Sequence, residues 1–190
     1  MRELVYYVAV SLDGYIAGPN GEFDAFPVDV DPTAALNERY GDAIPTQFAE
    51  ALGVRQTCEV FDTVLMGWNT FAIGLAEGVT SPYRHLRQFV FSRRNFAEGT
   101  NLTVTAADPV QVVQELKAEE GSAIWLCGGG NLATALIGEI DRLVLKRNPL
   151  LFGDGIPLFE PAVYDPSVFT EVGTDVTSSG VVVSEYRRRR

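Results

Sequence analysis

At residues 124–136 the sequence reads IWLCGGGNLATAL, an apolar run followed by three glycines and then by helix-forming residues. The apolar run predicts a buried strand over 123–127, and the residues after the glycines predict a helix over 132–138. Glycines at such a turn let the backbone approach a ligand, and a helix N-terminus offers unpaired N–H groups to a phosphate. The stretch therefore predicts a pyrophosphate-binding turn, although a tight strand-to-helix connection needs the same residues.

Two further stretches have the same character. Residues 64–71, VLMGWNTF, again give strand, glycine and helix start, and Asn69 or Thr70 could cap that helix. Two such turns in one sheet suggest a single extended ligand. Residues 89–94, FVFSRR, end a predicted strand with two adjacent arginines, which could hold a phosphate in bidentate fashion or could be solvated loop charges.

The rest of the chain alternates between strands and helices. This pattern predicts an α/β fold with a mostly parallel central sheet flanked by helices. Asp108 followed by Pro109 predicts the start of a helix that runs to about residue 120. The other predicted strands are 4–11, 61–66, 86–92, 102–105 and 142–145, and the other predicted helices are 33–40, 45–55 and 69–77.

The C-terminal part differs, because 168–177 and 180–187 alternate in polarity around a Ser-Ser-Gly turn and predict an antiparallel β-hairpin. We expect one domain over 1–187 and a frayed, solvated basic tail over 188–190, part of the arginine run that begins at residue 187. The glycine turn also fits a loose GxGxxA pattern. A Rossmann fold is nevertheless disfavoured, because four predicted strands precede this turn and the next strand ends in Lys146 and Arg147 instead of an acidic residue.

Composition narrows the function classes. The chain has 190 residues, 46% of them hydrophobic, and a formal net charge of -10, so its field repels nucleic acid and anionic membranes. Cys58 and Cys127 have no CxxC spacing and form no cluster with His85, the single histidine, so we expect neither a metal site nor a disulfide. We expect His85 to be structural and the protein to be cytoplasmic.

Five blocks of the sequence together resemble a known family: SLDGYIAGPNG at 11–21, MGWNTF at 66–71, FSRR at 91–94, IWLCGGGNL at 124–132 and NPLLFGDGIPLF at 148–159. They resemble the dihydrofolate reductase-like superfamily, in the branch similar to the C-terminal reductase domain of the riboflavin-biosynthesis deaminase-reductase. The resemblance implies a dihydrofolate reductase-like fold. It also implies NADPH-dependent hydride transfer to a small heterocyclic substrate similar to 5-amino-6-(5-phosphoribosylamino)uracil.

The resemblance also implies cofactor contacts. The nicotinamide is expected at Ala9, Ile16 and Ala17, and the 2′-phosphate at Ser92, Arg93 and Arg94. The pyrophosphate is expected between two sets of residues, which are Gly67, Trp68, Asn69 and Thr70 on one side and Cys127, Gly128, Gly129, Gly130, Asn131 and Leu132 on the other. The family has a cis peptide between two adjacent glycines, and Gly128-Gly129 matches that position.

One position departs from the family pattern. Relatives usually have Gly-Arg-x-Thr where this chain has Gly67-Trp68-Asn69-Thr70, so an arginine near the 2′-phosphate or adenine is replaced by tryptophan. Trp68 could stack on adenine but supplies no charge. A preference for NADPH over NADH therefore depends on Arg93 and Arg94, and NADH remains a possible cofactor.

The substrate side of the site is less defined by sequence. Asp13, in the SLDG block, and Asp29, near the position of the pteridine-anchoring carboxylate of folate reductases, are the candidate catalytic carboxylates. Asp13 could equally be a turn residue. Phe26, Phe71 and Gly153 are candidate substrate contacts. Two alternatives stay open, a dihydrofolate reductase and a non-catalytic NADP(H)-binding sensor, and the family branch suggests a homodimer.

Overall fold

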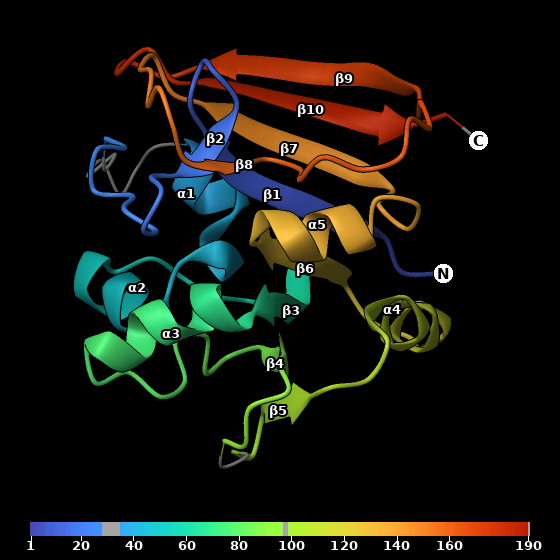
Figure 1. Ribbon diagram of the computed structural model, residues 1–190. Helices are drawn as coiled ribbons and strands as arrows, with labels where there is room; N and C mark the ends of the chain where they lie inside the picture. Colours follow the sequence, from blue (N-terminus) through green and yellow to red (C-terminus); the bar gives the residue numbers. More distant parts are fainter. Residues whose placement is uncertain (28–34, 97–98, 190) are drawn as a thin grey trace.

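The computed structural model of the chain describes residues 1–27, 35–96 and 99–189. Its main feature is an eight-stranded sheet in the order β5-β4-β3-β6-β1-β7-β10-β9 (Figure 1). The first six strands of this order pair in parallel, and β10 and β9 are antiparallel at one end. This confirms the predicted mostly parallel sheet with a C-terminal antiparallel hairpin.

The strands of the main sheet begin and end close to the predicted positions. They are β1 (Leu4–Val10), β3 (Phe61–Gly67), β4 (Arg87–Phe91), β5 (Leu102–Thr105), β6 (Ala123–Gly128), β7 (Arg142–Arg147), β9 (Phe169–Val176) and β10 (Val182–Arg188). The described helices are α1 (Ala35–Arg39), the 3-10 turn η1 (Gly41–Ala43), α2 (Thr46–Leu52), α3 (Trp68–Ala76), α4 (Pro109–Ala118) and α5 (Gly130–Ala135).

Successive residues of β1 divide the core into two halves. Val5 and Tyr7 face a cluster that includes Tyr40 and Phe71, from the α1 and α3 side. Leu4 and Tyr6 face the other cluster, which contains apolar residues of α4 and α5. This alternation follows from the period of two in a strand, and it makes β1 a central strand buried on both faces, as its apolar sequence predicts. The helix layers on either side of the sheet can be followed in Figure 1.

Local chemistry explains where several helices begin and end. The Asp108 carboxylate accepts hydrogen bonds from the N–H groups of Val110 (2.8 Å) and Gln111, so the predicted cap of α4 is confirmed. Helix α2 ends earlier than predicted because Gly53 adopts a left-handed conformation (φ 68°) at its C-cap. Helix α5 begins at Gly130, before the predicted start. Among the described helices, none is long and apolar enough to cross a membrane.

A second, two-stranded sheet was not predicted. It pairs β2 (Tyr15–Ala17) with β8 (Ile156–Pro157) in antiparallel fashion. It joins the loop after β1 to the loop after β7, two segments that are remote in sequence.

The interpretation of the C-terminal arginines as a frayed, solvated tail is wrong for the described ones. Strand β10 includes Arg187 and Arg188, because both pair with neighbouring strands. The Arg187 guanidinium donates to Glu3 Oε1 (2.7 Å), and Arg188 Nε donates to the carbonyl of Ile140 (2.7 Å). Arg189 Nε also donates to the Thr170 hydroxyl. These arginines fasten the last strand to the sheet.

Candidate active site

The two glycine turns lie side by side at the carboxyl edge of the sheet. Strands β3 and β6 are parallel neighbours, and Met66 pairs with Gly128, so both strands end at the same level. A Cβ atom added to Gly67 would lie 3.8 Å from Gly128 O, and one added to Gly129 would lie 3.7 Å from Thr70 Oγ1. The backbone of both turns is therefore close enough to contact one extended ligand.

The peptide bond between Gly128 and Gly129 is cis, as the family resemblance implies. Gly128 has a φ of 138°, which side-chain-bearing residues rarely adopt. Ile16 lies directly beside this turn, since its Cδ1 is 4.0 Å from the position of a Cβ on Gly128. The structure thus brings the loop after β1 to the turn after β6.

Helices α3 and α5 begin without a side-chain cap. Their N-cap residues are Gly67 and Gly129, which have no side chain to accept a hydrogen bond from the first turn. Helix α4 is different, because Asp108 occupies its N-terminus. Uncapped N-terminal N–H groups need an acceptor, and phosphate oxygens are well suited to them. The two turns therefore have backbone donors that are compatible with a phosphate group.

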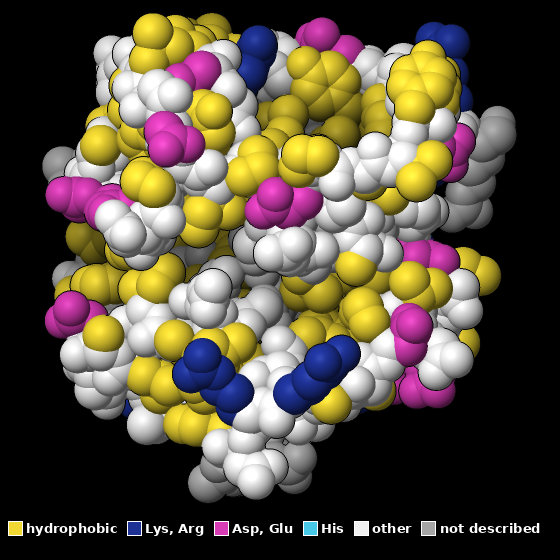
Figure 2. All heavy atoms as spheres, in the orientation of Figure 1, with side chains coloured by type: hydrophobic (Ala, Val, Ile, Leu, Met, Phe, Trp, Pro, Cys, Tyr) yellow, Lys and Arg dark blue, Asp and Glu magenta, His cyan; other side chains and the backbone are white. Residues whose placement is uncertain are grey.

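A basic patch borders these turns. Ser92, Arg93 and Arg94 follow β4, the neighbour of β3, and both arginines are exposed. The Arg94 guanidinium carbon lies 5.0 Å from the centroid of the Trp68 ring, so the cation stacks on the indole. Figure 2 shows basic side chains gathered low on this face, in the region of β4 and β5. Within the described residues no carboxylate forms an ion pair with Arg93 or Arg94.

Trp68 is held in place by two other aromatic rings. It makes edge contacts with Phe71 (5.8 Å between centroids) and Phe96 (5.9 Å). Phe71 itself is fully buried in the core. The prediction that Phe71 contacts substrate is therefore wrong for this structure, because the helical turn from Trp68 directs Phe71 inward, where it supports the Trp68 ring.

Asp13 ties the loop after β1 to the loop after β7. It accepts hydrogen bonds from the Ser11 hydroxyl, from Phe152 N–H (3.1 Å) and from Gly153 N–H (2.7 Å). The Ser11 hydroxyl, and after it the backbone N–H groups, lower the pKa of the Asp13 carboxyl. Asp13 is consequently ionised at neutral pH. Asp29, the other candidate carboxylate, lies outside the described residues.

The remaining predicted contacts have varied surroundings. Phe26 packs against Phe152 (5.0 Å between centroids), beside the Asp13 tie, and Gly153 donates to Asp13. Ala17 pairs with Ile156 of β8. A Cβ on Gly130 would lie only 2.5 Å from Pro157 O, so the absence of a side chain there permits close packing of α5 against β8. In α5, Asn131 is exposed and the Leu132 side chain is buried in the core, leaving its backbone as the part that could face a ligand.

Cys127 is the residue before the cis peptide. Burial raises the pKa of its thiol to about 12, and its sulfur lies 4.0 Å from the Tyr83 hydroxyl. The thiol is therefore neutral and unreactive at physiological pH. Within the described part of the chain there is also no group of three or more side chains that could hold a metal ion.

His85 has a structural environment, as expected. Its Nδ1 lies 3.0 Å from Thr46 Oγ1, and its Nε2 lies 2.9 Å from the Asp42 carbonyl. The Asp42 carboxylate in turn accepts hydrogen bonds from the backbone N–H groups of 57, 58, 60 and 61. This cluster fixes the segment that enters β3, and sequence reasoning did not detect it.

Sequence reasoning also missed a group beside Ala9. Ala9 pairs with Lys146 on β7, and the Lys146 ammonium lies 4.7 Å from the centroid of the Tyr7 ring. The Tyr7 ring stacks on Tyr40 with 4.6 Å between centroids. The sequence feature that could have identified this group is the position of Lys146 two residues after Val144, which places both side chains on the face of β7 that points into the core.

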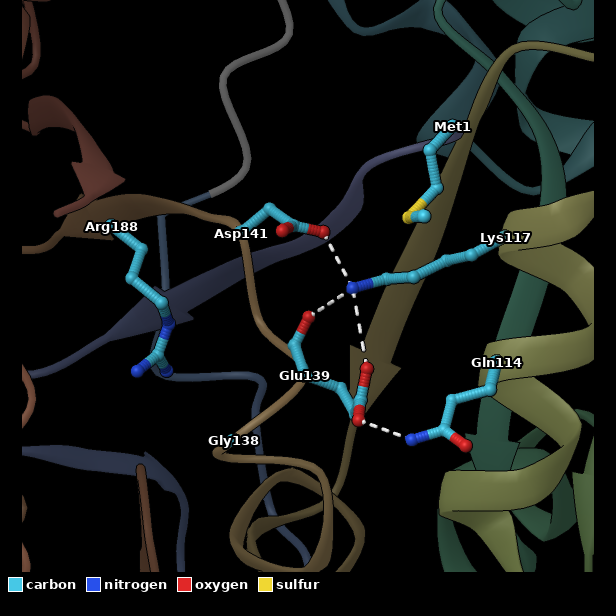
Figure 3. Close-up of a pocket in the computed structure, with 7 residues that line it drawn as sticks. All are labelled: Met1, Gln114, Lys117, Gly138, Glu139, Asp141 and Arg188. Carbon is cyan, nitrogen blue, oxygen red and sulfur yellow. Dashed lines mark hydrogen bonds and ion pairs between the residues drawn. The ribbon is translucent and has the colours of Figure 1, made fainter. Parts of the chain in front are cut away.

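A separate pocket of about 330 Å³ lies at the opposite, amino-terminal edge of the sheet, and it contains none of the predicted site residues. Figure 3 shows the Lys117 ammonium at its centre, donating to Asp141 (2.7 Å) and to the Glu139 carbonyl (2.6 Å). Its lining residues are Met1, Gln114, Lys117, Gly138, Glu139, Asp141 and Arg188. The Lys117 ammonium is thus paired within the pocket, and Arg188 donates to Ile140 O and Ser167 Oγ outside it.

Comparison with known proteins agrees with the geometry. The family model for the RibD C-terminal domain matches residues 2–183. The chain belongs to this family. Two relatives of uncharacterized function from Bacillus subtilis (strain 168) are each 29% identical to it. YwjB matches over 161 residues, 83% of either chain, and YyaP over 199 residues, 97% of this chain and 94% of its own.

Solved structures show the same fold. A protein from Shewanella sp. PV-4 that is assigned to riboflavin biosynthesis is 25% identical, with all of both chains covered and a TM-score of 0.73. The diaminohydroxyphosphoribosylaminopyrimidine deaminase/5-amino-6-(5-phosphoribosylamino)uracil reductase of Thermotoga maritima is 14% identical (TM-score 0.66), and the match covers 99% of this chain and 57% of that one. Dihydrofolate reductase from Enterococcus faecalis, complexed with NADP(H), is 17% identical (TM-score 0.61; 99% and 97% covered). The fold of this RibD C-terminal domain protein is dihydrofolate reductase-like.

Proposed function

We propose that the protein is an NADPH-dependent reductase that transfers hydride to a small heterocyclic substrate. The observation that carries this proposal is the pairing of two uncapped glycine turns at one sheet edge. Gly67 and Gly129 leave the first N–H groups of α3 and α5 available, and the pyrophosphate of a dinucleotide supplies matching acceptors. The substrate is of the pyrimidine class reduced by the Thermotoga maritima relative.

The chain's own residues would hold the cofactor along the carboxyl edge of the sheet. Arg93 and Arg94 would bind the 2′-phosphate, with Ser92 between them and β4. Ala9 and Ile16 would position the nicotinamide through backbone and apolar contacts. The bound NADPH supplies the hydride, and the protein aligns the acceptor carbon with it and excludes water.

Asp13 acts in this proposal as a positioning residue. Because its carboxyl is ionised, it cannot donate the proton that must accompany hydride transfer. It holds the 152–153 backbone against the loop that carries Ile16, and so it fixes the wall beside the nicotinamide. Asp29 remains the candidate for anchoring the substrate.

The test is a titration of the protein with NADPH and, separately, with NADH. Fluorescence of Trp68 and Trp125 is followed together with energy transfer to the reduced nicotinamide. We expect saturable transfer with both cofactors and tighter binding of NADPH. Both tryptophans are donors, because Trp125 Nε1 donates to the carbonyl of Tyr7, two residues from Ala9, and Trp68 lies beside Arg94. Trp68→Phe and Trp125→Phe should therefore each lower the transfer. Absence of saturable binding would refute the proposal.

Turnover separates the substrate classes. Loss of NADPH absorbance is followed with a ribosylaminopyrimidine and with dihydrofolate. We expect oxidation with the pyrimidine. Oxidation with dihydrofolate alone would establish a folate reductase, and binding without oxidation by either acceptor would favour a sensor protein.

We also propose that the protein is a cytoplasmic homodimer. The family branch supports this, and so does β9, which is an edge strand with exposed Val172 and Val176. Light scattering at micromolar concentration should give twice the chain mass. A monomeric mass would refute the dimer.

A further inference from the structure

Lys146 lies at the carboxyl end of the central parallel strands, on the same face as the Tyr7 ring. It is the penultimate residue of β7, as Ala9 is of β1 and Cys127 is of β6. Ala9 and Lys146 are paired across parallel strands, which lie about 4.8 Å apart. The proposed nicotinamide position beside Ala9 is therefore within reach of the Lys146 side chain.

Among the described residues, Lys146 has an aromatic ring beside its charge but no carboxylate. The chain contains two lysines, and the other one, Lys117, is buried and paired with Asp141. No carboxylate of residues 1–27, 35–96 or 99–189 forms an ion pair with Lys146, which is partly buried and contacts the Tyr7 ring. Burial raises the pKa of the Cys127 thiol, and the positive charge of Lys146 acts in the opposite direction and lowers it. A partly buried cation of this kind favours an electron-rich ligand atom.

The aromatic group beside Lys146 is rigid. Tyr40 stacks on Tyr7, and its hydroxyl donates to Glu185 (3.4 Å). Glu185 is itself paired with Arg142 (3.0 Å) and Arg39 (2.6 Å). The Lys146 ammonium thus lies against the Tyr7 ring, and Tyr40 packs on that ring. A ligand oxygen would therefore meet a preorganised cation.

We propose that Lys146 is a substrate-binding residue that donates hydrogen bonds to an anionic or carbonyl oxygen of a planar heterocycle. This inference rests on the proposed function, because the heterocycle must lie against the nicotinamide beside Ala9. Binding the oxygen at Lys146 orients the ring and withdraws electron density from the carbon that accepts the hydride. A substrate that lacks such an oxygen is discriminated against, because it would leave the ammonium unpaired.

The experiment uses orotate, a planar pyrimidine carboxylate, as the probe and 6-methyluracil as its neutral counterpart. The protein is labelled with ¹³C-lysine, so that the two lysines give two ε-CH₂ cross-peaks, which are assigned with Lys146→Arg. NADP⁺ is added to saturation, and each probe is then titrated. Affinities are measured in parallel for the wild type, Lys146→Met and Lys146→Arg.

We expect orotate to shift the Lys146 cross-peak saturably and to leave the Lys117 cross-peak unchanged. Lys146→Met should weaken orotate binding by about tenfold or more, as expected for loss of a hydrogen bond between charged groups, whereas Lys146→Arg should retain most of it. NADP⁺ should bind all three proteins with similar affinity.

Two results would overturn the inference while leaving the proposed function intact: NADP⁺ binding without binding of either probe, or affinities for both probes that are equal in the wild type and in Lys146→Met. Failure of the wild type to bind NADP⁺ would instead refute the proposed function, and the inference would fall with it.

Discussion

Replacing the basic residues after β4 should remove the preference for NADPH without removing dinucleotide binding. Arg93 and Arg94 are exposed and have no ion pair with the described residues, while Arg94 is oriented by its stacking on Trp68. A bidentate guanidinium–phosphate contact contributes more binding free energy than a simple ion pair on the surface, but solvent screens it here. We therefore assign roughly 1 to 1.5 kcal/mol of binding free energy to each arginine. This corresponds to about a 5- to 12-fold loss of NADPH affinity per substitution.

The assay compares NADPH and NADH affinity, measured by energy transfer, for Arg93→Met, Arg94→Met and the double variant. We expect NADH affinity to change by less than about twofold, because NADH carries no 2′-phosphate. The effect on NADPH should shrink as salt is raised, since the contacts are exposed. Arg87→Met is the matched control: it removes an arginine from the opposite end of β4, where the side chain pairs with Glu119. Equal losses for NADH and NADPH, or no loss for either, would refute the assignment of these arginines.

Three further predictions concern the framework of the site. Asp42→Ala should leave four backbone N–H groups without their acceptor and lower the free energy of unfolding by about 3–5 kcal/mol, measured by urea denaturation; a loss below about 1 kcal/mol would contradict this. Gly130→Ala should destabilise by about 1–3 kcal/mol because its Cβ would meet Pro157 O, while Gly138→Ala, which meets no atom within 4 Å, should be neutral or stabilising. Since folding lowers the pKa of Asp13, its contribution to stability is present above the unfolded value of about 3.9 and is lost as the pH falls below it. The stability difference between the wild type and Asp13→Asn should therefore vanish in acid, and a constant difference would refute the carboxylate's role.

Local patterns were sufficient to predict most of the fold. The apolar runs of β1, β3 and β6 are long enough to indicate buried strands, and Asp108-Pro109 identifies the start of α4 by its hydrogen-bonding chemistry. The β2–β8 sheet could not be predicted in this way. Its strands have only three and two residues, too few for a periodic pattern, and their pairing depends on how the two loops meet.

The parts of the candidate site that would contact a ligand through backbone atoms could be predicted from the sequence. Glycines after two parallel strands indicate a turn that contacts a ligand, and strand order then brings Gly67 and Gly128 together. Side-chain roles were less accessible. Phe71 occurs in a block that resembles the family, yet its position one turn into α3 buries it. Lys146 could be identified as a candidate only from the pairing of β7 with β1, which places it beside Ala9.

The distribution of satisfied polar groups distinguishes the two edges of the sheet. At the amino-terminal edge, Arg2 pairs with Asp62, and Lys117 pairs with Asp141, so charges there are neutralised within the protein. At the carboxyl edge, α3 and α5 begin without side-chain caps, and within the described residues Arg94 and Lys146 form no ion pairs. Buried polar groups in folded proteins nearly always have a partner, so the partly buried Lys146 favours a ligand group beside it. Within the described residues these uncapped helix starts and cations extend from β4 to β7, and they support the proposal that an anionic dinucleotide binds along this edge of the sheet.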